Sequence, residues 1–411
     1  MSNLNNTFID NIVRDCFARY SHLPKTGKPI ENEWTVLSCF IQYDRSNEDV
    51  DVVSLGTGTK CIGASKMSPK GDILNDSHAE VFARRGFLLY LYESIANVLK
   101  GEPSIFIYEN NQLKLKDCIH FIFYSSQLPC GDASIIPKSG EEEQYGDVLK
   151  AQKRVAEEDS FEIETKKQRL INDIYRTGAK CLPHGEQDPK EDGADYHRLG
   201  QVRTKPGRGD RTLSVSCSDK IARWIYLGVQ GSLLDMICGP IYIKHFIFGA
   251  GVPYCKESLQ RALLNRNIIE PVQLEVEPEF YQSSLVFSNI KNENNVQPAP
   301  GSIVWLKSNI QSSEVAVQGK KLGVTKKKAI LPSSSLCISK YNIYQKFINV
   351  LNSYSTLKEQ LCEQGDIENV PYNVMKSKST RYLARWIDVK NKFFEAWTVK
   401  SDMWDFCVNV Q

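Results

Sequence analysis

The sequence of 411 residues has no long apolar run. None of its apolar stretches approaches the roughly 20 residues that a helix needs to span a bilayer. Its first residues (MSNLNN) have neither the basic start nor the apolar stretch of a secretory signal. We therefore expect an intracellular protein, in the cytoplasm, the nucleus or both, with no membrane partner.

Paired cysteines are also missing. The 12 cysteines form no C-x-x-C motif and no regular spacing. In an intracellular chain of this length, this pattern favours reduced thiols over a disulfide framework. Most of these cysteines are expected to be small, buried, apolar residues.

The chain lacks an excess of either charge, since 51 Lys and Arg residues face 49 Asp and Glu residues. The basic residues are nevertheless clustered over 203–211 (RTKPGRGDR), 320–328 and 376–400. Such clusters suit a polyanion, although a solvated charged surface is the alternative for each of them.

The hydrophobic pattern alternates between strands and helices. Strands are expected over 34–43, 50–55, 119–124, 240–248 and 303–305. Helices are expected over 8–22, 78–99 and 219–227, with caps at 75–77 and at Ser216 or Ser218, and over most of the last eighty or so residues. This order predicts an α/β fold with a mixed sheet flanked by helices and a mainly helical C-terminal part packed on it.

No internal repeat or clean break divides the chain, so a single domain over residues 1–411 is expected. The segment 139–170, rich in Glu, Lys and Gln, is expected to be an exposed insertion, part helix and part disorder. The polar segment 177–212 is expected to form a long loop, which in a compact domain is usually functional or disordered.

Three short segments carry residues typical of a catalytic metal site. His78 and Glu80 lie two residues apart at the start of a predicted helix and therefore do not share one helix face. This spacing suits one metal ligand and one group that extends toward the metal without binding it. Cys130 follows a predicted buried strand, and Cys217 precedes a predicted helix, whose N-terminus stabilises a thiolate. One histidine and two thiolates leave the fourth position of a zinc ion open for water.

The nucleobase deaminases combine H-x-E with P-C-x-x-C, and their glutamate is not a zinc ligand. Here Ala133 stands where the second cysteine of that motif would be. On spacing alone, Cys217 is therefore also compatible with an ordinary buried cysteine.

The sequence motifs around these residues resemble those of the deaminase domain of the ADAR family. The matching strings are 74–80 (LNDSHAE), 126–132 (SQLPCGD) and 216–224 (SCSDKIARW), with 56–61 (GTGTKC) and 228–234 (GVQGSLL) in support. In that family the second thiolate comes from the S-C-S-D-K motif. The resemblance, from about residue 30 onward, implies a cytidine-deaminase-like fold, zinc held by His78, Cys130 and Cys217, and Glu80 as proton shuttle.

Within the family, 176–181 (RTGAKC) and 200–212 resemble the tRNA branch. The base-flipping segment of the double-stranded-RNA editors is not found. Too few residues precede the match for a double-stranded-RNA-binding domain, whose footprint spans about 16 base pairs. The resemblance implies conversion of adenosine to inosine in tRNA, at position 37 beside the anticodon of alanine tRNA. Editing of double-stranded RNA and a catalytically inactive RNA-binding relative are the alternatives, and neither DNA nor an obligate protein partner is expected.

The resemblance also implies RNA contacts. Thr59 and Lys60 match positions that line the nucleotide pocket, with an ordinary turn as the alternative. On the basic loop, the residues expected to meet tRNA phosphates are Arg203, Lys205, Arg208 and Arg211.

The family buries inositol hexakisphosphate within its fold. Carried over by motif, its contacts here are Arg84, Arg85, Lys220, Arg223, Trp224, Lys340, Tyr372, Lys376, Tyr382, Lys400 and Asp405, with Trp386 where the editors have lysine. Lys220, Arg223 and Trp224 share one helix face, and several buried cations require an anion. Surface lysines whose stems lie among aromatic residues are the alternative. Asp76 and Lys220 are expected to link the metal site to the inositol phosphate.

Overall fold

The computed structural model describes residues 4–138, 174–207, 210–266, 271–308, 313–325, 327–328, 331, 334–361 and 366–408. The predicted insertion at 139–170 and the predicted RNA contact Arg208 lie outside these residues. Within them, no helix is both long enough and apolar enough to cross a membrane.

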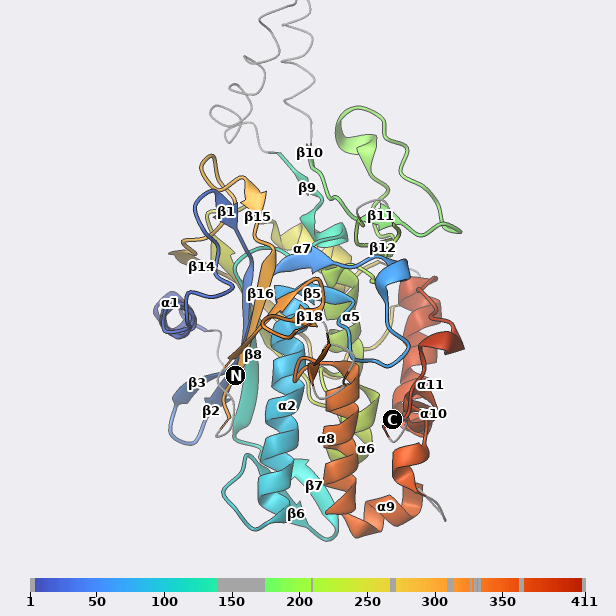
Figure 1. Cartoon of the computed structure of the whole chain (residues 1–411). Coiled ribbons are helices and arrows are strands. Elements are labelled where there is room, and N and C mark those ends of the chain that lie inside the picture. Colours follow the sequence, from blue (N-terminus) through green and yellow to red (C-terminus); the bar gives the residue numbers. More distant parts are fainter. Residues whose placement is uncertain are drawn as a thin grey trace, which may run out of the picture.

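An eight-stranded mixed sheet forms the centre of the molecule (Figure 1). Its β13 pairs in parallel with both β14 and β8, and all the other pairs are antiparallel. In spatial order the strands are β14 (Glu279–Val286), β13 (His245–Ala250), β8 (Ile119–Ser125), β2 (Leu37–Asp44), β3 (Asp49–Thr57), β16 (Gly301–Leu306), β17 (Ser313–Val317) and β18 (Lys320–Lys321).

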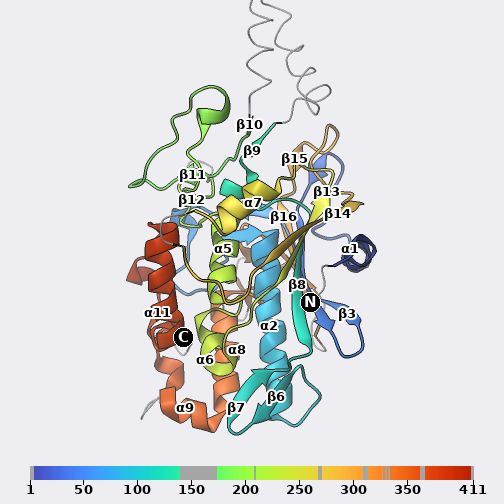
Figure 2. The ribbon, with the colours of Figure 1, turned by 180° about the vertical axis from the view of Figure 1, so that it is seen from behind.

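Both faces of the sheet are covered, so its central strands are apolar on both sides. On β8, Phe121 and Phe123 belong to the larger core on the face that packs against α2 (Ala79–Leu99) and α5 (Cys217–Leu227). Ile122 and Tyr124 point to the other face, which α1 (Asn6–Ser21) covers. Figures 1 and 2 show α1 and α2 on opposite sides of the sheet. The predicted α/β fold with a mixed sheet is confirmed.

A further layer of helices packs outside α2 and α5. The C-terminal helices α8 and α11 contact α2, α5 and α6, which confirms the predicted helical C-terminal part. The helices of the C-terminal part are α8 (Lys340–Asn352), α9 (Ser355–Leu361), α10 (Tyr372–Ser377) and α11 (Thr380–Val389), and α6 spans Gly231–Cys238.

Among the predicted element boundaries that were wrong, two differ from the structure for reasons of hydrogen bonding. We expected a cap for α2 at residues 75–77, but the N-cap is His78, because β5 (Asp76–His78) pairs with β4 (Thr59–Cys61). We expected a strand from residue 240, but β13 begins at His245. The carbonyl of Ile241 instead accepts a hydrogen bond from the N–H of Val229, in the turn after α5, at 2.8 Å.

Several elements had no clear signal in the sequence, among them β14, β17, α6 and α7 (Lys256–Leu263). Short two-stranded pairs also shape the long loop: β9 (Ile136–Pro137) with β10 (Ile174–Tyr175), and β11 (Lys180–Cys181) with β12 (Arg203–Thr204). These pairs lie at the end of the molecule where β5 is found (Figure 1).

Candidate metal centre and active site

The structure brings His78, Cys130 and Cys217 together at the N-terminal ends of two helices. Nδ1 of His78 lies 3.8 Å from Sγ of Cys130 and 3.7 Å from Sγ of Cys217. The ligand atoms all lie within 4.8 Å of one another, and no other such group of three His, Cys, Asp or Glu residues occurs in the part of the chain that the structure describes. The sequence named these three residues as ligands, and here they converge.

Local hydrogen bonds fix this geometry. Cys217 is the first residue of α5, and Ser216 caps that helix by accepting from Asp219 N at 3.2 Å. The N–H of Cys217 donates to Sγ of Cys130 at 3.4 Å, and the N–H of Ser218 donates to the Cys130 carbonyl at 3.0 Å. The turn that carries Cys130 is therefore joined to the start of α5.

Gly131 allows this close approach. Its φ is +108°, a region that favours glycine, and a Cβ there would lie 2.2 Å from Oγ of Ser216. The turn after Cys130 thus requires glycine both for its backbone angle and for the space beside α5.

A buried ammonium group holds the thiolate side of the site. Nζ of Lys205 donates to Sγ of Cys217 at 3.0 Å and to both carboxylate oxygens of Asp76 at 2.7 and 2.9 Å, and Lys205 is only 2% exposed. The hydrogen bond from Cys217 and the nearby Lys205 charge hold the pKa of Cys130 well below that of an ordinary thiol. Burial and the adjacent Cys130 raise the pKa of Cys217. The lowered pKa of Cys130 favours its thiolate form, which suits a cation beside it.

Glu80 lies in the first turn of α2 and is only 3% exposed. Glu80 is one of the groups that raise the pKa of the Cys217 thiol, after burial and the adjacent Cys130. Within the part of the chain that the structure describes, its Oε2 atom is buried without a hydrogen-bond partner. The same holds for Oγ1 of Thr59, a residue that pairs with His78 across β4 and β5. Buried polar atoms normally have partners, so these two atoms indicate a place for a polar molecule beside the ligands.

Asp76 connects this centre to a second group of charges. Although its burial acts in the opposite direction, the ammonium groups of Lys205 and Lys220 hold the pKa of Asp76 well below the usual value. Lys220 contacts Asp76 directly and donates to Oγ of Ser214 at 2.7 Å. Asp76 and Lys220, which the sequence predicted to link the metal site to an inositol phosphate, are thus in direct contact with each other, and the link itself stays a prediction.

The residues predicted to hold the inositol phosphate include a cluster of cations among aromatic rings. Burial and the neighbouring cations lower the pKa of Lys340 to about 6 and that of Lys400 to about 8, and burial lowers that of Arg85 to about 10. The guanidinium of Arg223 lies 3.8 Å from the ring of Trp386. The other ring contacts are Arg84 over Trp224 at 5.5 Å, Arg223 over Tyr382 at 5.7 Å, and Lys340 and Lys376 over Tyr372 at 5.9 and 5.2 Å.

These cations have few acidic partners. Asp405 accepts from the backbone N–H of Asn373 at 2.9 Å and of Phe406 at 3.0 Å, so its carboxylate is occupied by main-chain donors. Nη2 of Arg85 and Nε of Arg223 are buried without a hydrogen-bond partner among the described residues. Buried cationic donors without acceptors indicate that an anion belongs here.

The basic loop differs from its prediction. Arg203 is 0% exposed and bonds Asp188 through both terminal nitrogens at 2.7 Å, and Lys205 lies equally deep beside Asp76. Neither side chain reaches the surface, where an RNA backbone would lie, which corrects their assignment as phosphate contacts. Arg211 is exposed, and Lys60 is half-buried on β4 opposite Ser77.

The contact of Lys205 with a predicted metal ligand was missed in the sequence. Lys205 was placed among the RNA contacts because it stands in a basic, glycine-rich run, and composition does not separate a buried lysine from an exposed one. Asp132 and Asp188, which organise the long loop, were also missed, since isolated aspartates carry no pattern.

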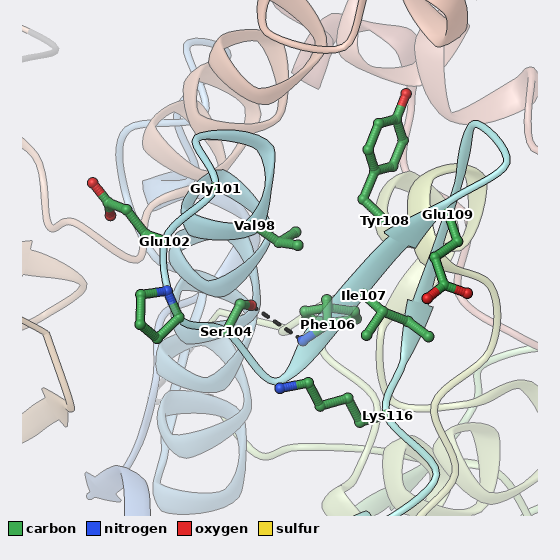
Figure 3. Close-up of a pocket in the computed structure, with 10 residues that line it drawn as sticks. Val98, Gly101, Glu102, Ser104, Phe106, Ile107, Tyr108, Glu109 and Lys116 are labelled. Carbon is green, nitrogen blue, oxygen red and sulfur yellow. Dashed lines mark hydrogen bonds between the residues drawn. The ribbon is translucent and has the colours of Figure 1, made fainter.

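An open hollow of about 450 Å³ lies elsewhere, at the C-terminal end of α2 beside β6 (Phe106–Glu109) and β7 (Gln112–Leu115) (Figure 3). Figure 3 shows Glu102, Glu109 and Lys116 at its edge. Its lining contains neither histidine nor cysteine, and it begins at Val98, about five helical turns from His78. It is therefore no part of the candidate active site.

His78 caps α2, Cys217 begins α5, Cys130 lies on the turn after β8, and Glu80 stands two residues after the histidine. One histidine, two cysteines and such a glutamate are the residue set of the zinc-dependent nucleobase deaminases. The sequence profile of the Adenosine-deaminase (editase) domain matches residues 54–401. The chain belongs to this adenosine-deaminase family.

Relatives cover nearly the whole chain. It is 37% identical to tRNA-specific adenosine deaminase 1 of Drosophila melanogaster, over 95% of both chains. It is 33% identical to tRNA-specific adenosine deaminase 1 of Homo sapiens, over 94% of this chain and 97% of that protein. The double-stranded RNA-specific editase Adar of Drosophila melanogaster is 36% identical over 59% of this chain and 33% of its own length.

Proposed function

We propose that this protein is a zinc-dependent deaminase that converts adenosine to inosine in tRNA, at position 37 beside the anticodon of alanine tRNA. The observation that carries this proposal is the convergence of His78, Cys130 and Cys217 next to Glu80, whose Oε2 has no hydrogen-bond partner among the described residues. The choice of tRNA is supported by relatives named tRNA-specific adenosine deaminase 1, which match along nearly the whole chain.

The three ligand atoms fit zinc in type and in spacing. A tetrahedral zinc ion with bonds of about 2.0 Å to nitrogen and 2.3 Å to sulfur sets these atoms roughly 3.5 Å apart. Here Nδ1 of His78 lies 3.7 and 3.8 Å from the two sulfurs. Three protein ligands leave a fourth position, and zinc supplies the Lewis acidity that activates water near neutral pH.

Glu80 acts as the proton shuttle in this proposal. Its buried carboxylate accepts a proton from the attacking water and delivers it to N1 of the adenine, then assists departure of ammonia from C6. Because it has no competing hydrogen-bond partner among the described residues, its Oε2 is available for these transfers. Thr59, whose Oγ1 also lacks a hydrogen-bond partner among those residues, lies opposite His78 and would contact the nucleotide.

The RNA reaches the site with its target base turned out of the stack. An anticodon loop is already single-stranded, so little unstacking energy is needed. Of the basic side chains predicted to bind RNA, Lys60 and Arg211 lie where they can take part, Lys60 on the strand beside His78 and Arg211 at the surface. Ala64 N donates to the Arg211 carbonyl at 2.8 Å, so the basic loop borders the segment that follows β4.

We also propose that the cation cluster binds inositol hexakisphosphate. Its dense negative charge would supply acceptors for the unpartnered nitrogens of Arg85 and Arg223 and keep Lys340 and Lys400 protonated. Through the contact of Lys220 with Asp76, this anion would be linked to Lys205 and hence to Cys217.

The deciding experiment is incubation of the zinc-loaded protein with total tRNA, followed by mapping of each adenosine that becomes inosine. Inosine at position 37 of alanine tRNA is the expected product. A long RNA duplex is assayed in parallel, because a double-stranded-RNA editor would modify the duplex instead. Absence of inosine from both substrates, with stoichiometric zinc bound, would identify a catalytically inactive RNA-binding relative.

A further inference from the structure

The long loop of residues 176–203 is attached at both ends to the turn that carries Cys130. Near its start, Oγ1 of Thr177 accepts from the N–H of Gly131 at 3.3 Å. Near its end, the N–H of Gly200 donates to Oδ1 of Asp132 at 2.8 Å. The loop therefore begins and ends beside a candidate metal ligand, and Figure 1 shows it projecting from the end of the molecule where β5 lies.

These attachments are themselves buttressed. Asp132 is 0% exposed, and Arg261 of α7 donates to its Oδ2 at 3.1 Å and to its carbonyl at 2.8 Å. At the same end of the loop, the N–H of Arg203 donates to Oδ2 of Asp219 at 3.0 Å, and Asp219 lies two residues after Cys217. The start of the loop is thus tied to the turn that carries Cys130, and its end is tied both to that turn and to the first turn of α5, which carries Cys217.

Between these attachments, Arg203 and Asp188 form a clasp. Two guanidinium nitrogens of Arg203 donate to the two carboxylate oxygens of Asp188, each at 2.7 Å, and one of them also donates to the Arg198 carbonyl at 2.6 Å. His197 lies 3.1 Å from the same carboxylate. Burial opposes ionisation of Asp188, but the bonds from Arg203 and from the Arg198 N–H hold its pKa well below the usual value. Two-pronged, buried ion pairs of this kind fix geometry strongly.

The clasp leaves particular groups on the outside of the loop. The guanidinium of Arg176 lies 3.9 Å from the ring of Tyr196. Arg198, whose Nε donates to Glu186 at 2.7 Å, and Leu199 are exposed. Aromatic rings and the planar guanidinium groups of arginine are the groups on which unstacked bases of single-stranded RNA stack. The loop thus offers a preformed surface for unpaired nucleotides next to the active site.

We propose that the clasp of Asp188 and Arg203 positions this loop as one wall of the RNA-binding face. Holding the loop in place before RNA arrives removes the cost of ordering it on binding, so the clasp raises the affinity for tRNA. Asp188 and Arg203 are positioning residues, since both act through the loop and neither contacts the metal ligands. This inference rests on the function proposed above.

The test is Asp188→Asn, which keeps the shape of the side chain and removes the charge that Arg203 binds. We expect the KM for tRNA to rise about tenfold because binding must then order the loop, with kcat at saturating tRNA and zinc content unchanged. Glu279→Gln is the matched control. It removes a carboxylate from an ion pair with Lys244 at 2.8 Å on the edge strand β14 and should leave both constants unchanged.

Hydrogen exchange supplies a readout that does not depend on catalysis. In Asp188→Asn, exchange should quicken in peptides from 176–203 and stay unchanged in α2 and α5. Arg203→Lys keeps the charge without the two-pronged contact, so it should raise KM by less, and it carries the test if Asp188→Asn does not fold.

Two results would overturn the inference: a lower kcat with unchanged KM, or faster loop exchange with unchanged KM. If the wild type makes no inosine in any RNA, the proposed function fails. The clasp is then judged by direct tRNA binding, where equal dissociation constants for wild type and Asp188→Asn would refute it.

Discussion

Among the residues at the centre, Glu80 is distinguished by what it does not contact. The three candidate ligands are held by one another and by Lys205, whereas Oε2 of Glu80 has no partner within the described structure. A carboxylate kept buried and unpartnered beside a cation site is suited to proton transfer, because its acceptor atom is free for water or substrate.

Replacement of Glu80 by Gln should therefore abolish inosine formation and leave the metal in place. We expect the rate to fall by at least about 10²-fold, the usual contribution of a general acid–base group, with one zinc per chain still measured by atomic absorption. Loss of zinc together with activity would instead make Glu80 part of the metal-holding structure.

Lys205 has a different role at the same scale. Its ammonium is the donor to Sγ of Cys217 and an ion-pair partner of Asp76. We expect Lys205→Met to weaken zinc binding by about 10- to 100-fold, the range found when a partner of a ligand is removed. Competition with a chelator at fixed pH measures this change. Lys66→Met, at an exposed position, is the control, and equal zinc affinities for the two variants would contradict the role.

At the scale of elements, the site depends on how closely the turn after β8 approaches the start of α5. That approach is set by the backbone of Gly131 and by hydrogen bonds from the first turn of α5 to Cys130. The same two elements hold the long loop through Asp132 and Asp219. A change in their spacing would disturb the ligands and the loop together.

Gly131→Ala tests this spacing. We expect it to lower the free energy of unfolding by about 2 kcal/mol or more and to reduce zinc content, because the new Cβ would meet Ser216 at a positive φ. Urea denaturation and metal analysis measure the two effects. Gly101→Ala is the control, since its φ is also positive, at +78°, but nothing lies within 4 Å of the added Cβ. Equal losses in both variants would show that backbone angle alone matters.

At the scale of the whole molecule, the cation cluster joins α2 and α5 to the C-terminal helices. Arg85 comes from α2, Arg223 from α5, Lys340 from α8 and Lys376 from α10. Without an anion, their mutual repulsion and burial oppose the packing of the C-terminal part on the sheet core. A bound polyanion would turn this destabilising repulsion into attraction. Because the repulsion depends on protonation of the lysines, the stability of the anion-free protein should depend on pH.

The direction in which the free energy of unfolding changes with pH follows from the lowered pKa values of two lysines. Lys340 and Lys400 have folded-state pKa values of about 6 and about 8, against 10.5 in the unfolded chain. Over this window the unfolded state binds more protons, so the free energy of unfolding of the anion-free, zinc-loaded protein should rise with pH. Thermal melts at pH 6 and pH 9 should give a higher Tm at pH 9, and added inositol hexakisphosphate should raise the Tm more at pH 6. Lys340→Met should reduce the difference, and an equal Tm at both pH values without anion would contradict this account.

The hydrophobic pattern of the sequence determined two of the central elements closely. The continuous apolar run over 119–124 predicted β8, and the helical period after His78 predicted α2, because both elements are long and well buried. The edge strand β14 was missed, because its burial alternates irregularly where it packs on α1. The short strand β5 was missed because it owes its existence to β4, a partner brought to it by the fold.

The sequence also named His78, Glu80, Cys130 and Cys217, because the motifs around them are local and resemble those of the ADAR family; spacing alone had left Cys217 open. Only the tertiary structure decided which charges face inward. Arg203 and Lys205 stand two apart in a run that reads as an exposed basic loop, yet both are buried against Asp188 and Asp76. Burial of a charge depends on a partner that can come from anywhere in the chain, here from 15 and 129 residues away. A local sequence pattern does not identify such a distant partner, because only the folded chain brings the two charges together.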